Sequence, residues 1–194
     1  MNDVRNAVRE AYGEAIGNRT GKAGCDVTAI TDMTKGNYTA EAVAGTPQDV
    51  VEQSFGCGNP VQAALLKPGE RVLDLGSGAG LDLILASKAV GAVGHVYGLD
   101  MTPPMLNKAR KNLDRLGIRN VTLLRGYIEE MPLHDRSVEV LISNCVINLS
   151  PDKDKVFAEA FRVLTPGGRF CVSDVVLMKP VPEKLKQSPA AWSG

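Results

Sequence analysis

A glycine-rich segment and a later carboxylate form the pattern with the clearest chemical meaning in this 194-residue chain. The segment Asp74-Leu-Gly76-Ser77-Gly78-Ala-Gly80 follows a short apolar run, and Asp100 ends the next apolar run. Glycines at the end of a strand let the backbone approach a ligand where a Cβ would clash, and a carboxylate ending the next strand can bind both ribose hydroxyls. The spacing predicts a site for a nucleotide-type cofactor.

The details of this segment favour a cofactor with a cationic amino-acid tail. A dinucleotide fingerprint has the form GxGxxG, whereas these glycines run GxGxG and position 81 is Leu. The segment therefore does not have to bind a diphosphate, and Asp74 inside the turn motif can form an ion pair with an ammonium group. S-adenosylmethionine carries such a group, and Pro166-Gly167-Gly168 before another apolar run is consistent with it. The alternatives are a nicotinamide site or a site that has lost its ligand.

The elements that must hold this site alternate between strand and helix. Apolar runs predict strands at 71–75, 94–99, 121–125, 138–143 and 169–176, and helical periodicity predicts helices at 80–90, 103–117 and 152–164. This order predicts a doubly wound, mostly parallel α/β sheet of Rossmann-like type, with ligands at the carboxyl ends of the strands.

An N-terminal extension precedes this sheet. Apolar residues at helical spacing predict an amphipathic helix over 4–15, and residues 17–45 have the composition of a long irregular loop. Thr46, Pro47 and Asp49 are typical of a helix start, so a further helix is expected up to about Ser54. We predict an extension over 1–60, a cofactor-binding domain over 61–178 and a linker over 179–194.

The composition limits the classes of binding partner that we expect. The chain has 22 Lys plus Arg and 22 Asp plus Glu, so its net charge gives no strong electrostatic attraction for nucleic acid or an anionic membrane. No long apolar span or signal-peptide pattern is present, which predicts a cytoplasmic protein with a small-molecule substrate. In that compartment the four cysteines are expected to be thiols rather than structural disulfides.

Burial in a hydrophobic core does not readily explain the positions of three of the cysteines. Cys145 ends a predicted strand, at the edge where a donated methyl group would point, and Cys57 lies between two glycines. Cys25 lies in the long loop, with no large apolar residue in the run before it. Cys171 is in the middle of the last apolar run, where core packing accounts for it.

At these residues the chain resembles arsenite S-adenosylmethionine methyltransferases, a family of class I methyltransferases, over nearly its whole length. The resemblance rests on Ser54-Phe55-Gly56-Cys57-Gly58-Asn59-Pro60, Val72-Leu73-Asp74-Leu75-Gly76-Ser77-Gly78, Gly126-Tyr127-Ile128-Glu129 and, most specifically, Ile142-Ser143-Asn144-Cys145-Val146-Ile147-Asn148-Leu149-Ser150. The resemblance also implies a smaller carboxyl-terminal region with a further cysteine, and we expect this sequence to stop before that region.

The resemblance implies that Cys25, Cys57 and Cys145 bind trivalent arsenic as three thiolates and present its lone pair to the sulfonium methyl group. Thiolates suit this soft centre. The substrate would be arsenite or its thiol conjugate, a thiol reductant would take part, and the role would be arsenic detoxification. The number of methyl groups transferred, the order of thiol engagement and the oligomeric state are left open.

Each part of the cofactor receives predicted contacts. Asp100 would hold the ribose, and Asp74 would lie near the ammonium of the methionine part. The remaining assignments are Gly76, Ser77, Gly78 and Asn144 at the methionine part, Ile128, Glu129 and Met101 around the adenine, and Phe55 closing the donor side. The alternative for Glu129 and Glu130 is a solvated acidic surface pair.

Two other functions remain open at this point. One is methyl transfer to another small acceptor, such as a quinone or sterol, which would need a base and an apolar pocket. The other is a thiol protein that binds a metalloid or zinc without catalysis, although the cysteines lack the close CxxC spacing that is usual for zinc.

Overall fold

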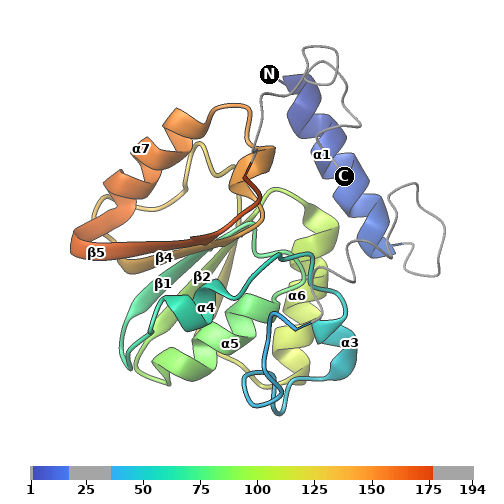
Figure 1. The fold of residues 1–194 in the computed structure, drawn as a ribbon, viewed down its shortest axis with the longest axis vertical. Coiled ribbons are helices and arrows are strands. Elements are labelled where there is room, and N and C mark those ends of the chain that lie inside the picture. The colour runs from blue at the N-terminus through green and yellow to red at the C-terminus, as the bar shows by residue number, and fades with distance from the viewer. Residues whose placement is uncertain (1, 18–35, 177–194) are drawn as a thin grey trace.

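A five-stranded parallel sheet forms the centre of the molecule (Figure 1). The computed structural model describes residues 2–17 and 36–176, with no side-chain detail for 2–4. The strands are β1 (Arg71–Leu75), β2 (His95–Asp100), β3 (Val121–Arg125), β4 (Val138–Asn144) and β5 (Leu164–Ser173), in the order β3-β2-β1-β4-β5. All neighbouring pairs are parallel, so the predicted α/β doubly wound sheet is confirmed.

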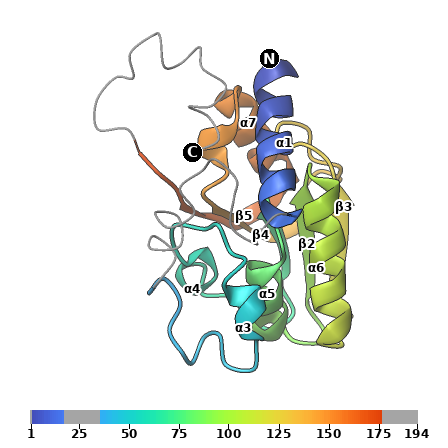
Figure 2. The ribbon, with the colours of Figure 1, turned by 90° about the vertical axis from the view of Figure 1, so that its right-hand side faces the viewer.

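Helices cover both faces of the sheet (Figures 1 and 2). α4 (Pro60–Ala63), α5 (Leu81–Val90) and α6 (Pro103–Arg115) lie on one face, and α7 (Lys153–Val163) lies on the other. α1 (Asn2–Gly17) packs beside α6, while α3 (Gln48–Val51) and the 3-10 turn η1 (Ile147–Leu149) are short connections. No helix in the described ranges has the length and hydropathy that crossing a bilayer requires.

Side-chain alternation along β1 divides the core into two layers. Leu73 and Leu75 pack with the α7 side, whereas Val72 packs with α5 and α4. Asp74 shares the Val72 face and is only 2% exposed, although the rest of the strand core is apolar. A carboxylate in this position is costly unless it has a partner, which marks the end of β1 as a functional site.

Most element boundaries lie within about two residues of the predictions, but β5 ends at Ser173 rather than 176 and the helix expected up to about Ser54 ends at Val51. β5 begins at Leu164 rather than 169, because its pairing with β4 jumps from Val138–Leu164 to Val140–Arg169 and carries Pro166-Gly167-Gly168 within the strand as an irregularity. The short helix α4 was not expected, and it starts where Asn59 accepts a hydrogen bond from the Gln62 amide at 3.0 Å.

Candidate active site

One pocket opens at the carboxyl ends of β1, β2 and β4, where the strand order reverses. It is lined by all ten residues predicted to contact the cofactor: Phe55, Asp74, Gly76, Ser77, Gly78, Asp100, Met101, Ile128, Glu129 and Asn144. Cys145 lines it as well. The structure therefore brings these residues together, and the individual contact assigned to each stays a prediction.

The glycine turn is held by backbone contacts and by Asp100. Gly76 and Gly78 have φ values of +67° and +52°, which glycine adopts without strain. A Cβ on Gly76 would lie 2.5 Å from a methyl carbon of Val146, so no side chain fits there. The Asp100 carboxylate accepts hydrogen bonds from the Gly78 amide at 2.9 Å and the Thr102 amide at 2.8 Å, which fixes it in the pocket.

Two buried polar atoms at this turn have no partner among the described residues: Asp74 Oδ2 and Ser77 Oγ. Burial raises the pKa of Asp74 well above its usual range, and the charges of Asp82 and Asp100 raise it further. A cationic, hydrogen-bond-donating group in the pocket would satisfy the carboxylate and relieve this repulsion. The residues present thus fit the ammonium end of a cofactor such as S-adenosylmethionine.

Glu129 lies at another part of the pocket and is 3% exposed. The Ser150 hydroxyl donates to Glu129 Oε1 at 2.6 Å, and the Arg5 guanidinium approaches the same oxygen at 3.5 Å. The alternative of a solvated acidic pair is therefore wrong for Glu129, whereas the neighbouring Glu130 is exposed. Burial on this scale requires partners, and Arg5 supplies one from a helix more than a hundred residues away in the sequence.

Residues of α1 complete the wall of the pocket. Arg5, Val8 and Tyr12 line it, and the ring of Tyr12 meets the ring of Phe55 edge-on at 5.6 Å. Sequence periodicity identified the helix but gave no signal of its docking site.

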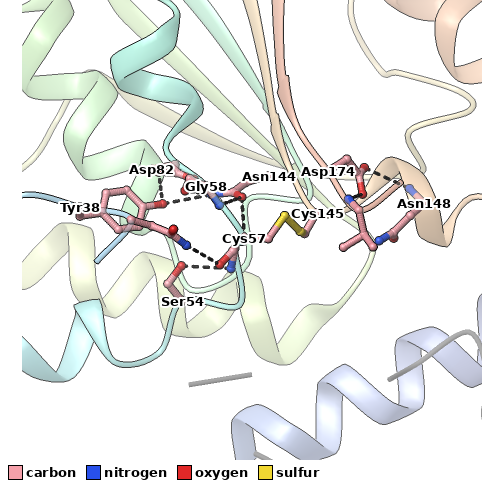
Figure 3. The surroundings of a disulfide bond; sticks show 12 residues. Tyr38, Ser54, Cys57, Gly58, Asp82, Asn144, Cys145, Asn148 and Asp174 are labelled. Atoms are coloured by element: carbon pink, nitrogen blue, oxygen red, sulfur yellow. Dashed lines mark hydrogen bonds between the residues drawn. A yellow bond between two sulfur atoms is a disulfide. The ribbon is translucent and has the colours of Figure 1, made fainter. Parts of the chain in front are cut away.

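The Cys57–Cys145 pair lies beside this pocket. Cys57 and Cys145 form a disulfide with their Cα atoms 5.9 Å apart (Figure 3). The expectation of free thiols is wrong for these two residues, because the fold brings their Cα atoms within the range that a disulfide spans. Cys145 has a left-handed backbone, with φ +56°, and its amide donates to the Ser173 carbonyl at 2.7 Å.

The side chain of Asn144 turns toward the Cys57 segment. Its Oδ1 accepts from the Cys57 amide at 2.9 Å, and its Nδ2 donates to Asp82 Oδ2 and to the Tyr38 hydroxyl, each at 3.0 Å. These partners leave the Asn144 side chain little capacity for the predicted contact with the methionine part. Neither Tyr38 nor Asp82 was a candidate from the sequence, since one lies in an irregular segment and the other reads as an ordinary first-turn carboxylate.

The other two cysteines differ in what the structure describes. Cys25 falls outside the described residues, and within them no group of three or more His, Cys, Asp or Glu side chains is arranged to hold a metal ion. Cys171 is a free thiol packed against the core layer of α5, as its position in the sequence predicted.

This sheet order, with a glycine turn and a strand-end carboxylate at the switch point, defines a class I methyltransferase fold. A family model described as a methyltransferase domain matches residues 66–194. The chain belongs to this methyltransferase domain family.

Three known proteins show how far the similarity extends. An arsenite methyltransferase from Halobacterium salinarum is 42% identical over 99% of this chain and 52% of its own length. A solved arsenic(III) S-adenosylmethionine methyltransferase from Chlamydomonas reinhardtii is 44% identical over 77% of this chain and 52% of that one, with a TM-score of 0.69. A ubiquinone/menaquinone biosynthesis C-methyltransferase from Vibrio parahaemolyticus is 42% identical over 66% of this chain and 49% of its own length.

The chain thus spans about half the length of the curated relatives it matches. The domain match and these relatives indicate S-adenosylmethionine as the methyl donor. Similarity to the arsenite enzyme reaches across nearly the whole chain, whereas similarity to the quinone enzyme covers two thirds of it.

The buried Asp74 predicts that donor binding depends on pH. In the free protein its raised pKa keeps a protonated fraction at pH values where an ordinary aspartate is ionised, and a bound ammonium favours the carboxylate. Binding should therefore release a proton, and affinity should rise with pH until the pH exceeds the raised pKa. Calorimetry with S-adenosylhomocysteine in buffers of different ionisation enthalpy measures this release. Asp74→Asn should bind more weakly and release no proton, and an unchanged release in that variant would assign the proton to another group.

Proposed function

We propose that this chain catalyses S-adenosylmethionine-dependent methylation of trivalent arsenic held by cysteine thiolates. The observation that carries the proposal is the meeting of Cys57 and Cys145, 88 residues apart in sequence, at the edge of the donor pocket. A methyltransferase acting on oxygen or carbon has no need of paired sulfur atoms there. A thiophilic substrate does.

Reduction is the first requirement of this chemistry. Two equivalents of an external thiol convert the disulfide to two protein thiols and are themselves oxidised to a disulfide. The two thiols can then displace oxygen ligands of arsenite: each As–S bond replaces an As–O bond, and the thiol proton leaves with the oxygen as water. Cys25 is the proposed third ligand. We expect the protein to work in the cytoplasm, where cellular thiols supply the reductant, and to serve arsenic detoxification.

Methyl transfer then needs alignment rather than a base. Bound S-adenosylmethionine supplies an electrophilic methyl group on a sulfonium. The thiolates would hold arsenic so that its lone pair faces this methyl group. The As–C bond would form as the S–CH3 bond breaks, with the electron pair of that bond staying on the departing sulfur and no proton moving. Arsenic would then be formally pentavalent, and the external thiol that reduces the disulfide is the proposed reductant that returns it to the trivalent state. Consistent with this, no histidine lines the described pocket. Holding two reactants in line can contribute about 7–11 kcal/mol toward the barrier.

Comparison of the oxidised and reduced protein tests the proposal. The reduced protein should bind one arsenite and convert it to a methylated product with the donor present, whereas the disulfide form should do neither. Chromatographic arsenic speciation reads the product. Failure of the reduced protein to bind arsenite would contradict the proposal.

Methyl transfer to a carbon acceptor is the second candidate, because the quinone-biosynthesis relative matches two thirds of the chain at 42% identity. It is favoured if the reduced protein methylates a quinone precursor and ignores arsenite. The cysteine pair would then have no catalytic part.

A further inference from the structure

We infer that Asn144 is a positioning residue whose side-chain amide holds the Cys57 segment against Cys145 in the reduced protein as well as in the disulfide form. The link of this inference to arsenic rests on the proposed function. The positioning itself concerns two sulfur atoms and is measurable without arsenic.

The oxygen of the Asn144 side chain anchors the Cys57 segment. Oδ1 accepts hydrogen bonds from the amides of Cys57 at 2.9 Å and Gly58 at 3.2 Å. A Cβ on Gly56 would overlap the Asn144 amide, so the segment lies directly on this side chain. Backbone atoms of Cys57 are therefore fixed by a residue other than its disulfide partner.

The nitrogen of the same side chain lies among three acceptors, of which Asp82 is buried (Figure 3). Nδ2 lies 3.0 Å from each of the Gly58 carbonyl, the Tyr38 hydroxyl and Asp82 Oδ2. The Tyr38 hydroxyl donates to Asp82 Oδ1 at 2.8 Å, which leaves its lone pair to accept from Asn144. Asp82 belongs to the first turn of α5, so the amide is attached to a rigid element.

The charge state of Asp82 depends on the hydrogen bonds that it accepts from Asn144 and Tyr38. Burial raises the pKa of Asp82, while hydrogen bonds from Asn144 and Tyr38 oppose that rise by stabilising its carboxylate. An ionised Asp82 makes charge-assisted bonds, which hold the amide more strongly than neutral acceptors would.

Asn144 also precedes Cys145 in the chain, and the amide of Cys145 is itself fixed by the Ser173 carbonyl at 2.7 Å. One side chain thus connects the backbone of Cys57 to the backbone beside Cys145. When the S–S bond is broken, these contacts remain to keep the two sulfur atoms near one another. A pair of thiols held in this way binds one thiophilic centre without first ordering a loop.

The thiol–disulfide equilibrium of the Cys57–Cys145 pair tests the inference. Protein is equilibrated in glutathione buffers of graded ratio, the thiols are trapped by alkylation, and the pair is resolved by peptide mass spectrometry. Asn144→Ala should lower the effective concentration of the two thiols about tenfold, since about 1.4 kcal/mol of lost positioning is a tenfold change. Tyr38→Phe keeps the ring but removes one of the hydrogen bonds of Asn144 and the hydrogen bond to Asp82, so a smaller decrease in the same direction is expected.

Asn120→Ala is the matched control. Asn120 is half-buried, donates to the Gly91 carbonyl at 2.9 Å and accepts from the Ser87 hydroxyl at 2.6 Å, away from the pocket. Its loss should lower the thermal stability but leave the thiol equilibrium unchanged. The inference would be overturned if Asn144→Ala and Tyr38→Phe both showed the same thiol–disulfide equilibrium as the Asn120→Ala control.

Arsenite affinity of the reduced variants separates this inference from the proposed function. Asn144→Ala should bind arsenite about tenfold more weakly than the reduced parent, by the same positioning loss. If the reduced parent binds no arsenite while the thiol equilibrium shifts as expected, the proposed function fails and the positioning role stands.

Discussion

Replacement of either Cys57 or Cys145 by serine should lower the rate of arsenite methylation by at least about a hundredfold, since a misplacement of about 1 Å at a reacting centre can cost about 10²-fold. A serine hydroxyl is nearly isosteric, but it is a hard oxygen ligand that does not deprotonate at neutral pH, so the arsenic centre loses a thiolate. Rates of product formation under reducing conditions, measured by arsenic speciation, give the effect.

Donor binding distinguishes this loss from misfolding. Affinity for S-adenosylhomocysteine should change by less than about twofold in both serine variants, because neither sulfur carries the donor contacts predicted for Asp74 and Asp100. Cys171→Ser is the matched control, since Cys171 is a free thiol packed against the core. Turnover at the parental rate in Cys57→Ser and Cys145→Ser would refute methylation of a thiolate-bound substrate.

Asp100→Ala should weaken donor binding by about 1.5–3 kcal/mol, the range for a hydrogen bond to a charged group, which corresponds to about 10- to 150-fold in the dissociation constant. The substitution removes the predicted ribose contact and leaves the amides of Gly78 and Thr102 without their acceptor. Calorimetric titration with S-adenosylhomocysteine measures the loss.

Two further variants make the Asp100 result specific. Asp100→Asn keeps an acceptor oxygen and nearly the same shape, so its loss should be smaller. Asp114→Ala removes an exposed carboxylate paired with Arg119 on the surface and should leave the affinity unchanged. Equal affinity of Asp100→Ala and the parent protein would move the ribose site away from the end of β2.

The donor pocket was predictable because its determinants are local in sequence. A strand that ends in glycines, followed by a second strand that ends in Asp100, specifies a parallel pair whose carboxyl ends meet, and the pairing of β1 with β2 follows that pattern. Asp74 was predictable for the same reason: it stands near the end of β1, two residues before Gly76, and the alternation of β1 decides which face it occupies.

The arrangement around the cysteines was not predictable from local patterns. Tyr38, Asp82 and Asn144 lie in three separate segments, and only the packed fold shows that they share hydrogen bonds. The disulfide depends on the same long-range contacts, since nothing in the spacing of Cys57 and Cys145 indicates that their Cα atoms are 5.9 Å apart. Docking of α1 beside the pocket is likewise a tertiary event, because an amphipathic helix shows that it has a buried face but not what it contacts.

X-ray absorption spectroscopy at the arsenic edge, on the reduced protein with one equivalent of arsenite, counts the ligands of the substrate directly. A first shell made of sulfur atoms, which loses one sulfur in Cys57→Ser and one in Cys145→Ser but none in Cys171→Ser, is the expected result. An oxygen-only shell, or a sulfur shell that both serine variants leave intact, would contradict the binding of arsenic by these two residues.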